Sequence, residues 1–282
     1  MNLVYSIMDK TLPFEWVNFT FMKNALIAVL LIAPLLGIVG TMIVNNKMSF
    51  FSDALGHSAL TGIAIGVMLG VHNYIISMLG FALLFALCIS SIIESEISSS
   101  DTIIGVFSSA GVALGVVLLS MNGGFSKYSS YLIGDILAIQ PFEIRMLFWV
   151  LVLVIIIWVL SFNKLILSSL NSDLASSKQV DVSFYKNIFV ILIAIIVTVS
   201  IKWVGILIIN SLLVLPAAAA RNVSRSMMGY HALSILFSLF SGVTGLVLSY
   251  YLGTAAGGTI VLVASIIFFV TFFINRANKI DR

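Results

Sequence analysis

The chain has 282 residues, of which 61% are hydrophobic and only 9% are charged, and its mean hydropathy is +1.18. About a quarter of the residues in a soluble domain are charged, so this composition excludes an ordinary soluble protein. The net charge of +3 comes from few ionisable groups. Basic residues in such a chain orient helices in a membrane, and we expect no nucleic-acid partner. We therefore expect an all-α polytopic membrane protein.

Long apolar segments recur along the whole chain, and runs of about 18 residues or more predict transmembrane helices. We expect a single transmembrane domain, 1–282, with about nine transmembrane helices (eight or nine). The break near residues 202–205 is inferred from length alone, because 187–220 is nearly continuous. The expected spans are 25–45, 52–70, 73–93, 102–121, 146–162, 187–203, 204–220, 230–252 and 258–275.

Two further segments are too short or too polar to span. Residues 128–142 predict a half-helix or re-entrant piece that Pro141 ends. The loop 163–186 is the largest hydrophilic connection, and Ser172 or Asp173 could cap a short helix inside it. A permease needs such a helix to dock on a motor protein, and a solvated connector is the alternative.

The basic residues of the loops predict the orientation of the chain, because cytoplasmic loops carry an excess of Lys and Arg. More of them lie on the side of the C-terminus than on the opposite side. We therefore expect a cytoplasmic C-terminus and a cytoplasmic loop at 163–186. An odd number of spans then places the N-terminal segment, 1–24, outside.

Asp53, His57 and Thr61 are spaced four residues apart and share one helix face. Ionisable residues inside a membrane segment are costly and usually functional. A carboxylate oxygen with an imidazole nitrogen suits Zn²⁺, Mn²⁺ or Fe²⁺ better than Ca²⁺ or Mg²⁺. Two side chains leave the coordination shell incomplete. A neutral Asp–His hydrogen bond that ties helices together is the alternative.

Two other polar residues are weaker candidates for a transport path or gate, as is Thr61. Asp135 follows a glycine in the expected half-helix, where it could face a cavity or pair with Lys127. Asn210 lies inside an apolar span, where we expect a hydrogen bond between helices.

Motifs for catalysis are missing. The sequence has no G-x-x-x-x-G-K-[ST] and no H-E-x-x-H, which argues against nucleotide binding by a P-loop and against a zincin-type protease. No Ser-His or Cys-His pair has a supporting context. We therefore do not expect an enzyme, and we expect no covalently bound cofactor.

Six stretches, taken in order, carry a resemblance to a known family. The chain resembles the membrane subunit of zinc/manganese/iron-type ABC importers. The matching stretches are KMSFFSDALGHSALTGIAIG (47–66), DTIIGVFSSAGVALGVVLLS (101–120), YLIGDILAI (131–139), NSDLASSKQVDV (171–182), VGILIINSLLVLPAAAAR (204–221) and LGTAAGGTIVLV (252–263).

The resemblance implies a homodimeric permease in the bacterial cytoplasmic membrane. Two ATPase subunits at the cytoplasmic face would bind and hydrolyse ATP, and an extracytoplasmic metal-binding protein would deliver the ion. The D-A-L-x-H element of the family corresponds to Asp53 and His57, which would form the metal site. The stretch 171–182 corresponds to the coupling helix, with Asp173, Leu174 and Ala175 at its centre. Family members often have proline where Thr61 stands.

Two other classes of transporter stay open. A proton-coupled secondary metal transporter would use Asp53 and His57 as a proton relay and would need no ATPase. An ABC permease for iron chelates or cobalamin has a similar general plan, although an Asp–His pair has no obvious use for a bulky chelate. The sequence does not select among Mn, Zn and Fe.

Overall fold

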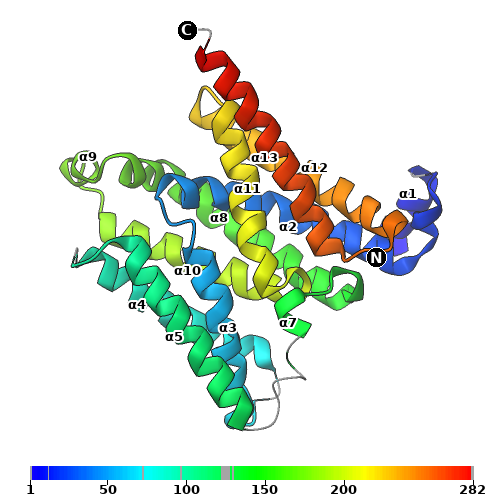
Figure 1. The fold of residues 1–282 in the computed structure, drawn as a ribbon, viewed down its shortest axis with the longest axis horizontal. Coiled ribbons are helices and arrows are strands. Elements are labelled where there is room, and N and C mark those ends of the chain that lie inside the picture. Colours follow the sequence, from blue (N-terminus) through cyan, green and yellow to red (C-terminus); the bar gives the residue numbers. More distant parts are fainter. Residues whose placement is uncertain are drawn as a thin grey trace.

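The computed structural model describes residues 2–11, 13–71, 73–95, 97–121, 128 and 130–280 (Figure 1). All the regular elements in these residues are helices, so the expected all-α class is confirmed. The long helices are α2 Thr20–Asn45, α3 Phe51–Met68, α4 Tyr74–Glu94, α5 Ser100–Met121, α8 Pro141–Leu170, α10 Val182–Val204, α11 Ile206–Val223, α12 Met227–Leu252 and α13 Ala256–Ile280. The short ones are α1 Asn2–Thr11, η1 Glu15–Asn18, α7 Ser130–Ile133, η2 Ile136–Ala138 and α9 Ser172–Ser177.

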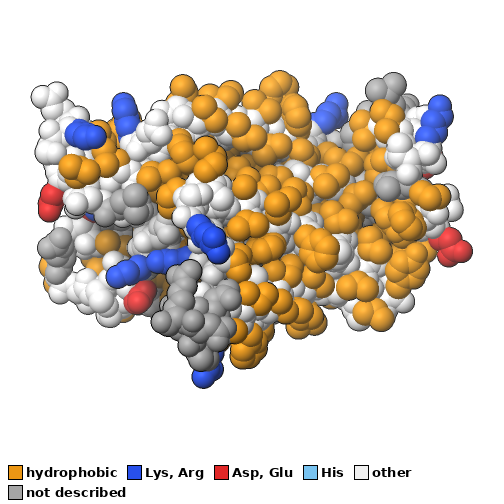
Figure 2. Space-filling model, turned by 90° about the horizontal axis from the view of Figure 1, so that it is seen from above, with side chains coloured by type: hydrophobic (Ala, Val, Ile, Leu, Met, Phe, Trp, Pro, Cys, Tyr) orange, Lys and Arg blue, Asp and Glu red, His pale blue; other side chains and the backbone are white. Residues whose placement is uncertain are grey.

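Seven helices of the described residues are long and apolar enough to cross a membrane, namely α2, α4, α5, α8, α10, α12 and α13. Helix α3 is not among them, since Asp53 and His57 lower its hydropathy, and α11 contributes only a shorter apolar stretch, Ile208–Val223. Nine membrane crossings therefore stay a prediction. Figure 2 shows hydrophobic side chains across the middle of one face, with charged side chains mostly toward its two ends.

Helix α3 lies inside the bundle. It packs against α4 and α5 on one side and against α10 and α11 on the other, and most of its residues are buried. Helix α2 is similarly enclosed by α8, α11 and α12. The Asp53–His57 segment is thus held by several neighbouring helices and is not a lipid-facing surface helix.

The expected break between two spans occurs at Gly205, which follows α10 and has a φ of +90°. Its neighbour in space is Gly134, at the end of α7, with a φ of +70°. A Cβ on either glycine would lie within 2.4 Å of the other's backbone or that of its chain neighbour, so only glycines allow this contact. The contact fixes the short helices α7 and η2 against the α10–α11 turn.

The prediction that Pro141 ends a half-helix was wrong. Pro141 is the first residue of α8, where its missing N–H costs nothing and its fixed φ suits a helix. The Glu143 carboxylate accepts a hydrogen bond from the Gln140 N–H at 2.8 Å and closes the first turn. The expected half-helix is two short helical turns, α7 and η2.

Helix α8 also extends beyond the expected span to Leu170, so the hydrophilic connection is shorter than 163–186. The short helix expected in this loop is present as α9. Its cap was predicted wrongly, because the Asn171 side chain, and neither Ser172 nor Asp173, accepts the Leu174 N–H, at 2.9 Å.

Candidate metal site

The first two turns of α3 place Asp53 and His57 next to each other. Asp53 lies in the first turn, where a negative charge suits the helix N-terminus. His57 Nε2 lies 3.5 Å from Asp53 Oδ2, and the two side chains are 20% and 33% exposed, respectively. Both residues belong to the same helix, so this pair does not tie two helices together, which was the alternative to a metal site.

The second ring nitrogen of His57 has no fixed partner. Nδ1 is buried and makes no hydrogen bond within the described part of the chain. Metal-binding histidines usually donate their other N–H to a carboxylate or carbonyl. Asp53 is therefore the one polar side chain paired with this imidazole among the described residues.

Asp53 lines a hollow of about 400 Å³ between the N-terminal parts of α3 and α5. A water needs about 10–15 Å³, so a hydrated ion fits. Asp101 contributes a second carboxylate, and Ser108 and Ser109 contribute hydroxyl groups. Among the described residues no group of three or more His, Cys, Asp and Glu side chains is close enough to hold an ion. The pair is thus at most a partial coordination site.

Thr61 and Asn210 do not line this hollow. The buried Thr61 hydroxyl donates to the Gly111 carbonyl of α5 at 2.6 Å. Asn210 Oδ1 accepts a hydrogen bond from the Ser52 hydroxyl at 2.6 Å, so the expected bond between helices is present. Both residues hold α3 in place, one from α5 and one from α11.

Asp135 faces a different hollow of about 280 Å³, lined also by Tyr131, Ala138, Lys202 and Trp203. One of its carboxylate oxygens accepts the Leu137 N–H at 3.0 Å. The cavity that we expected near Asp135 is present, whereas Lys127, its other expected partner, lies outside the described residues. Burial raises the pKa of Tyr131, and the Lys202 ammonium partly opposes this effect.

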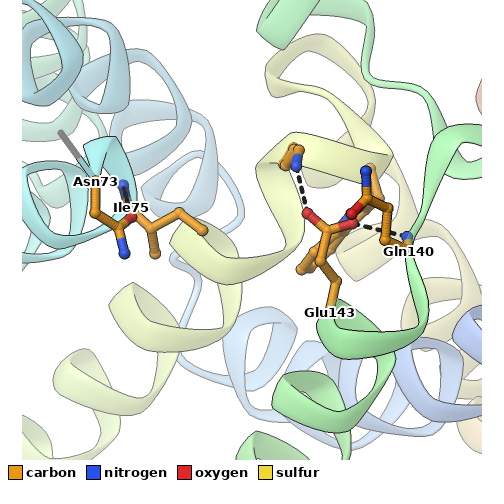
Figure 3. A network of polar contacts seen from close by, with 6 residues as sticks. Asn73, Ile75, Gln140 and Glu143 are labelled. Atoms are coloured by element: carbon orange, nitrogen blue, oxygen red, sulfur yellow. Dashed lines mark hydrogen bonds and ion pairs between the residues drawn. The ribbon is translucent and has the colours of Figure 1, made fainter.

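Sequence reasoning missed a buried carboxylate beside this second hollow. Glu143 is 1% exposed and accepts hydrogen bonds from Lys202 Nζ, from Trp203 Nε1 at 3.4 Å and from the Gln140 N–H (Figure 3). The signal that could have revealed its local role is the Gln-Pro-x-Glu pattern, which is typical of a helix start.

Helix α9 lies at one end of the molecule (Figure 1). Asp173 and Leu174 are exposed, and Leu174 keeps 46% of its surface accessible. Ala175 is fully buried and packs toward the chain's own helices. Of the three expected contact residues, Asp173 and Leu174 are therefore available to a partner, whereas Ala175 anchors the helix.

Comparison with known proteins gives a consistent result. Residues 18–275 match the ABC 3 transport family. The chain is 34% identical to the manganese import system permease protein ScaB of Streptococcus gordonii, over 93% of this chain and 94% of that protein. It is 30% identical to the high-affinity zinc uptake system membrane protein ZnuB of Buchnera aphidicola, over 94% and 98%.

Solved structures agree with the fold. PsaBC from Streptococcus pneumoniae in complex with Fab superposes with a TM-score of 0.81 at 29% identity, and the match covers all of both chains. An inward-facing conformation of a putative metal-chelate type ABC transporter gives a TM-score of 0.71 at 13% identity, over 89% of this chain and 85% of that one. The latter likeness shows the fold alone. The chain belongs to the ABC 3 transport family of membrane permeases.

Proposed function

We propose that the chain is the transmembrane permease of an ATP-driven importer for divalent transition-metal ions, namely Mn, Zn or Fe. The observation that carries the proposal is the Asp53–His57 pair on α3, inside a mostly apolar bundle, with Asp53 at the edge of an open hollow. The names of the relatives support the substrate class, since they import manganese or take up zinc.

The proposed route uses the pair as a transient site. A carboxylate oxygen and an imidazole nitrogen bind first-row divalent cations, but the pair alone leaves most of the coordination sphere to water, to a second copy of the chain or to both. An incomplete site binds weakly enough for the ion to leave again, which conduction requires. Asp53, which lines the hollow, would exchange a ligand with a hydrated ion there, and His57, one turn further along α3, would supply the nitrogen ligand.

The energy would come from other chains. Two ATPase subunits would bind at the cytoplasmic face and contact α9 through Asp173 and Leu174, two of the exposed residues of that helix. An extracytoplasmic metal-binding protein would deliver the ion at the opposite face. In this arrangement the N-terminus is outside and the C-terminus is cytoplasmic.

Metal uptake by cells that produce the complete transporter tests the site. We expect Asp53→Asn and His57→Gln to lower uptake by about tenfold or more, because each removes one of two ligands. Glu15→Gln is the control. It also replaces a carboxylate by an amide, at an exposed position in η1 that belongs neither to the α3 pair nor to the stretch 171–182. Normal uptake by both α3 variants at normal expression would refute the site.

A second arm tests the energy source. Inactivation of the partner ATPase should abolish uptake in cells that retain the unchanged permease. Uptake that persists and follows the proton gradient would instead identify a secondary transporter with Asp53 and His57 as a proton relay. Competition among Mn²⁺, Zn²⁺ and Fe²⁺ on the purified complex with its binding protein then identifies the metal.

A further inference from the structure

Five long helices enclose two adjoining spaces at the end of the bundle that leads into α9. The larger space is about 210 Å³ and the smaller about 20 Å³. Asn46, Lys186 and Phe189 line both spaces, so the two adjoin. Because a water needs about 10–15 Å³, the smaller space accommodates one oxygen atom and the larger space accommodates a polar group of several atoms.

Hydrogen-bond donors without partners surround the smaller space. Ser168 and Ser169 line it, and both hydroxyl oxygens are buried without a hydrogen bond to any described residue. Ser168 is only 8% exposed. A buried polar group without a partner is destabilising and rare in folded proteins. Two such groups side by side indicate that a ligand supplies their partner.

The charge of the site selects an anion. Lys186 lines both spaces, and its ammonium forms no ion pair within the described residues. Lysine offers three donors and no acceptor, so it repels a metal ion. An ammonium with two hydroxyl groups matches a phosphate group, which presents several acceptor oxygens to donors on different helices.

The larger space continues to a carboxylate. Glu94 lines it, and its oxygens lie 3.1 and 3.2 Å from the Ser183 hydroxyl that donates to them. Met48, Ile93 and Val190 form apolar walls. A ligand that fits has a phosphate, an ammonium near it and an apolar remainder. The ends of membrane-spanning helices lie at the level of the lipid head groups. Basic pockets between helices bind head groups at this level.

We propose that this space binds the head group of an aminophospholipid. The phosphate lies against Lys186, Ser168 and Ser169, and the ammonium lies toward Glu94. No residue lines both this space and the hollow beside Asp53, and the test reads lipid binding, so it does not depend on transport.

The test measures lipid retained by the purified permease–ATPase complex after exchange into detergent, using mass spectrometry and known mixtures of phosphatidylethanolamine and phosphatidylcholine. We expect the unchanged complex to retain phosphatidylethanolamine selectively. Lys186→Gln should lower retention by about tenfold or more, because a charge-assisted hydrogen bond is lost. Lys164→Gln is the control. Lys164 lies near the end of α8, as Ser168 and Ser169 do. Its ammonium lies over the Tyr185 ring, 5.2 Å from the ring centroid, and the residue lines neither space.

A double variant, Ser168→Ala with Ser169→Ala, separates binding from folding. Without lipid it should be as stable as the unchanged protein, because the substitutions remove hydroxyl groups that had no partner. Added phosphatidylethanolamine should raise the apparent Tm of the unchanged complex more than that of the variant. Glu94→Gln should abolish the preference for phosphatidylethanolamine over phosphatidylcholine. Equal retention by Lys186→Gln, or binding of inorganic phosphate without retained lipid, would overturn the proposal.

Discussion

The buried carboxylate of Glu143 allows a quantitative test of how the α7–η2 segment and the α10–α11 turn are held. Glu143→Leu removes the acceptor of the Gln140 N–H and the Trp203 Nε1–H. A buried donor without a partner costs about 1–3 kcal/mol, and leucine leaves no large cavity. The Lys202 side chain is 43% exposed and its ammonium reaches water, so the loss of its ion pair with Glu143 adds little to the cost. We expect the variant to lose about 3–4 kcal/mol of unfolding free energy.

Two further substitutions resolve the contributions to this network. The amide oxygen in Glu143→Gln can still accept from Gln140 and Trp203, so only the contact with Lys202 is lost. We expect a cost of about 1 kcal/mol after solvent screening. Lys202→Met leaves a buried carboxylate without its cation and should cost about 3 kcal/mol, the lower end for a broken buried pair, because two N–H donors remain. Glu143→Gln combined with Lys202→Met should cost less than the sum of the two.

Thermal unfolding of the purified complex measures these differences, at about 2–4 °C of apparent Tm for each kcal/mol. Glu15→Gln makes the same chemical change at an exposed position and should leave the Tm unchanged. Equal destabilisation by Glu143→Gln and Glu143→Leu, or a normal Tm for Lys202→Met, would refute these roles of the Glu143 carboxylate.

Three further predictions concern single contacts. Thr61→Val removes the hydrogen bond to Gly111 and should lower stability by about 1 kcal/mol while uptake per folded molecule stays normal; reduced uptake at normal stability would instead assign Thr61 to the path. Leu174→Asp should weaken co-purification of the ATPase, because an exposed apolar contact is replaced by a charge, and unchanged recovery would exclude Leu174 from that interface. Gly134→Ala should cost at least about 2 kcal/mol, since its Cβ would lie 2.3 Å from Gly205 N, and a normal Tm would contradict the close contact.

The sequence was sufficient to predict the helices because apolar runs of this length have few alternatives in a membrane. Each of the nine expected segments overlaps one long helix of the structure. The expected span at 52–70 begins one residue after α3 does. The break at Gly205 was also found, although only chain length indicated it.

The limits of α8 were predicted less well, for two physical reasons. Hydropathy follows the continuously apolar part of a helix, whereas α8 continues through residues 163–170, where Asn163, Lys164, Ser168 and Ser169 interrupt the apolar run. Pro141 was interpreted as a terminator, but proline is equally suited to a first helical turn. The glutamate two residues later carried the information that distinguishes the two cases, because its carboxylate accepts the Gln140 N–H.

The candidate sites differ in how far apart in the sequence their residues are. Asp53 and His57 are one helical turn apart, so their proximity follows from helix geometry alone. Glu143 and Lys202 are separated by 59 residues, and their contact depends on how α8 packs against α10. The burial of Ala175 likewise depends on the docking of α9. Local periodicity contains no information about such contacts.

The position of α3 links the Asp53–His57 pair to its neighbours. Ser52, next to Asp53, donates a hydrogen bond to Asn210 of α11. Thr61, one turn beyond His57, donates a hydrogen bond to the Gly111 carbonyl of α5. The hollow beside Asp53 lies between α3 and α5, so any movement of α5 relative to α3 changes the space available to an ion. A pair held this way keeps its own geometry while its surroundings change. That combination suits a site that must bind an ion in one state and release it in another.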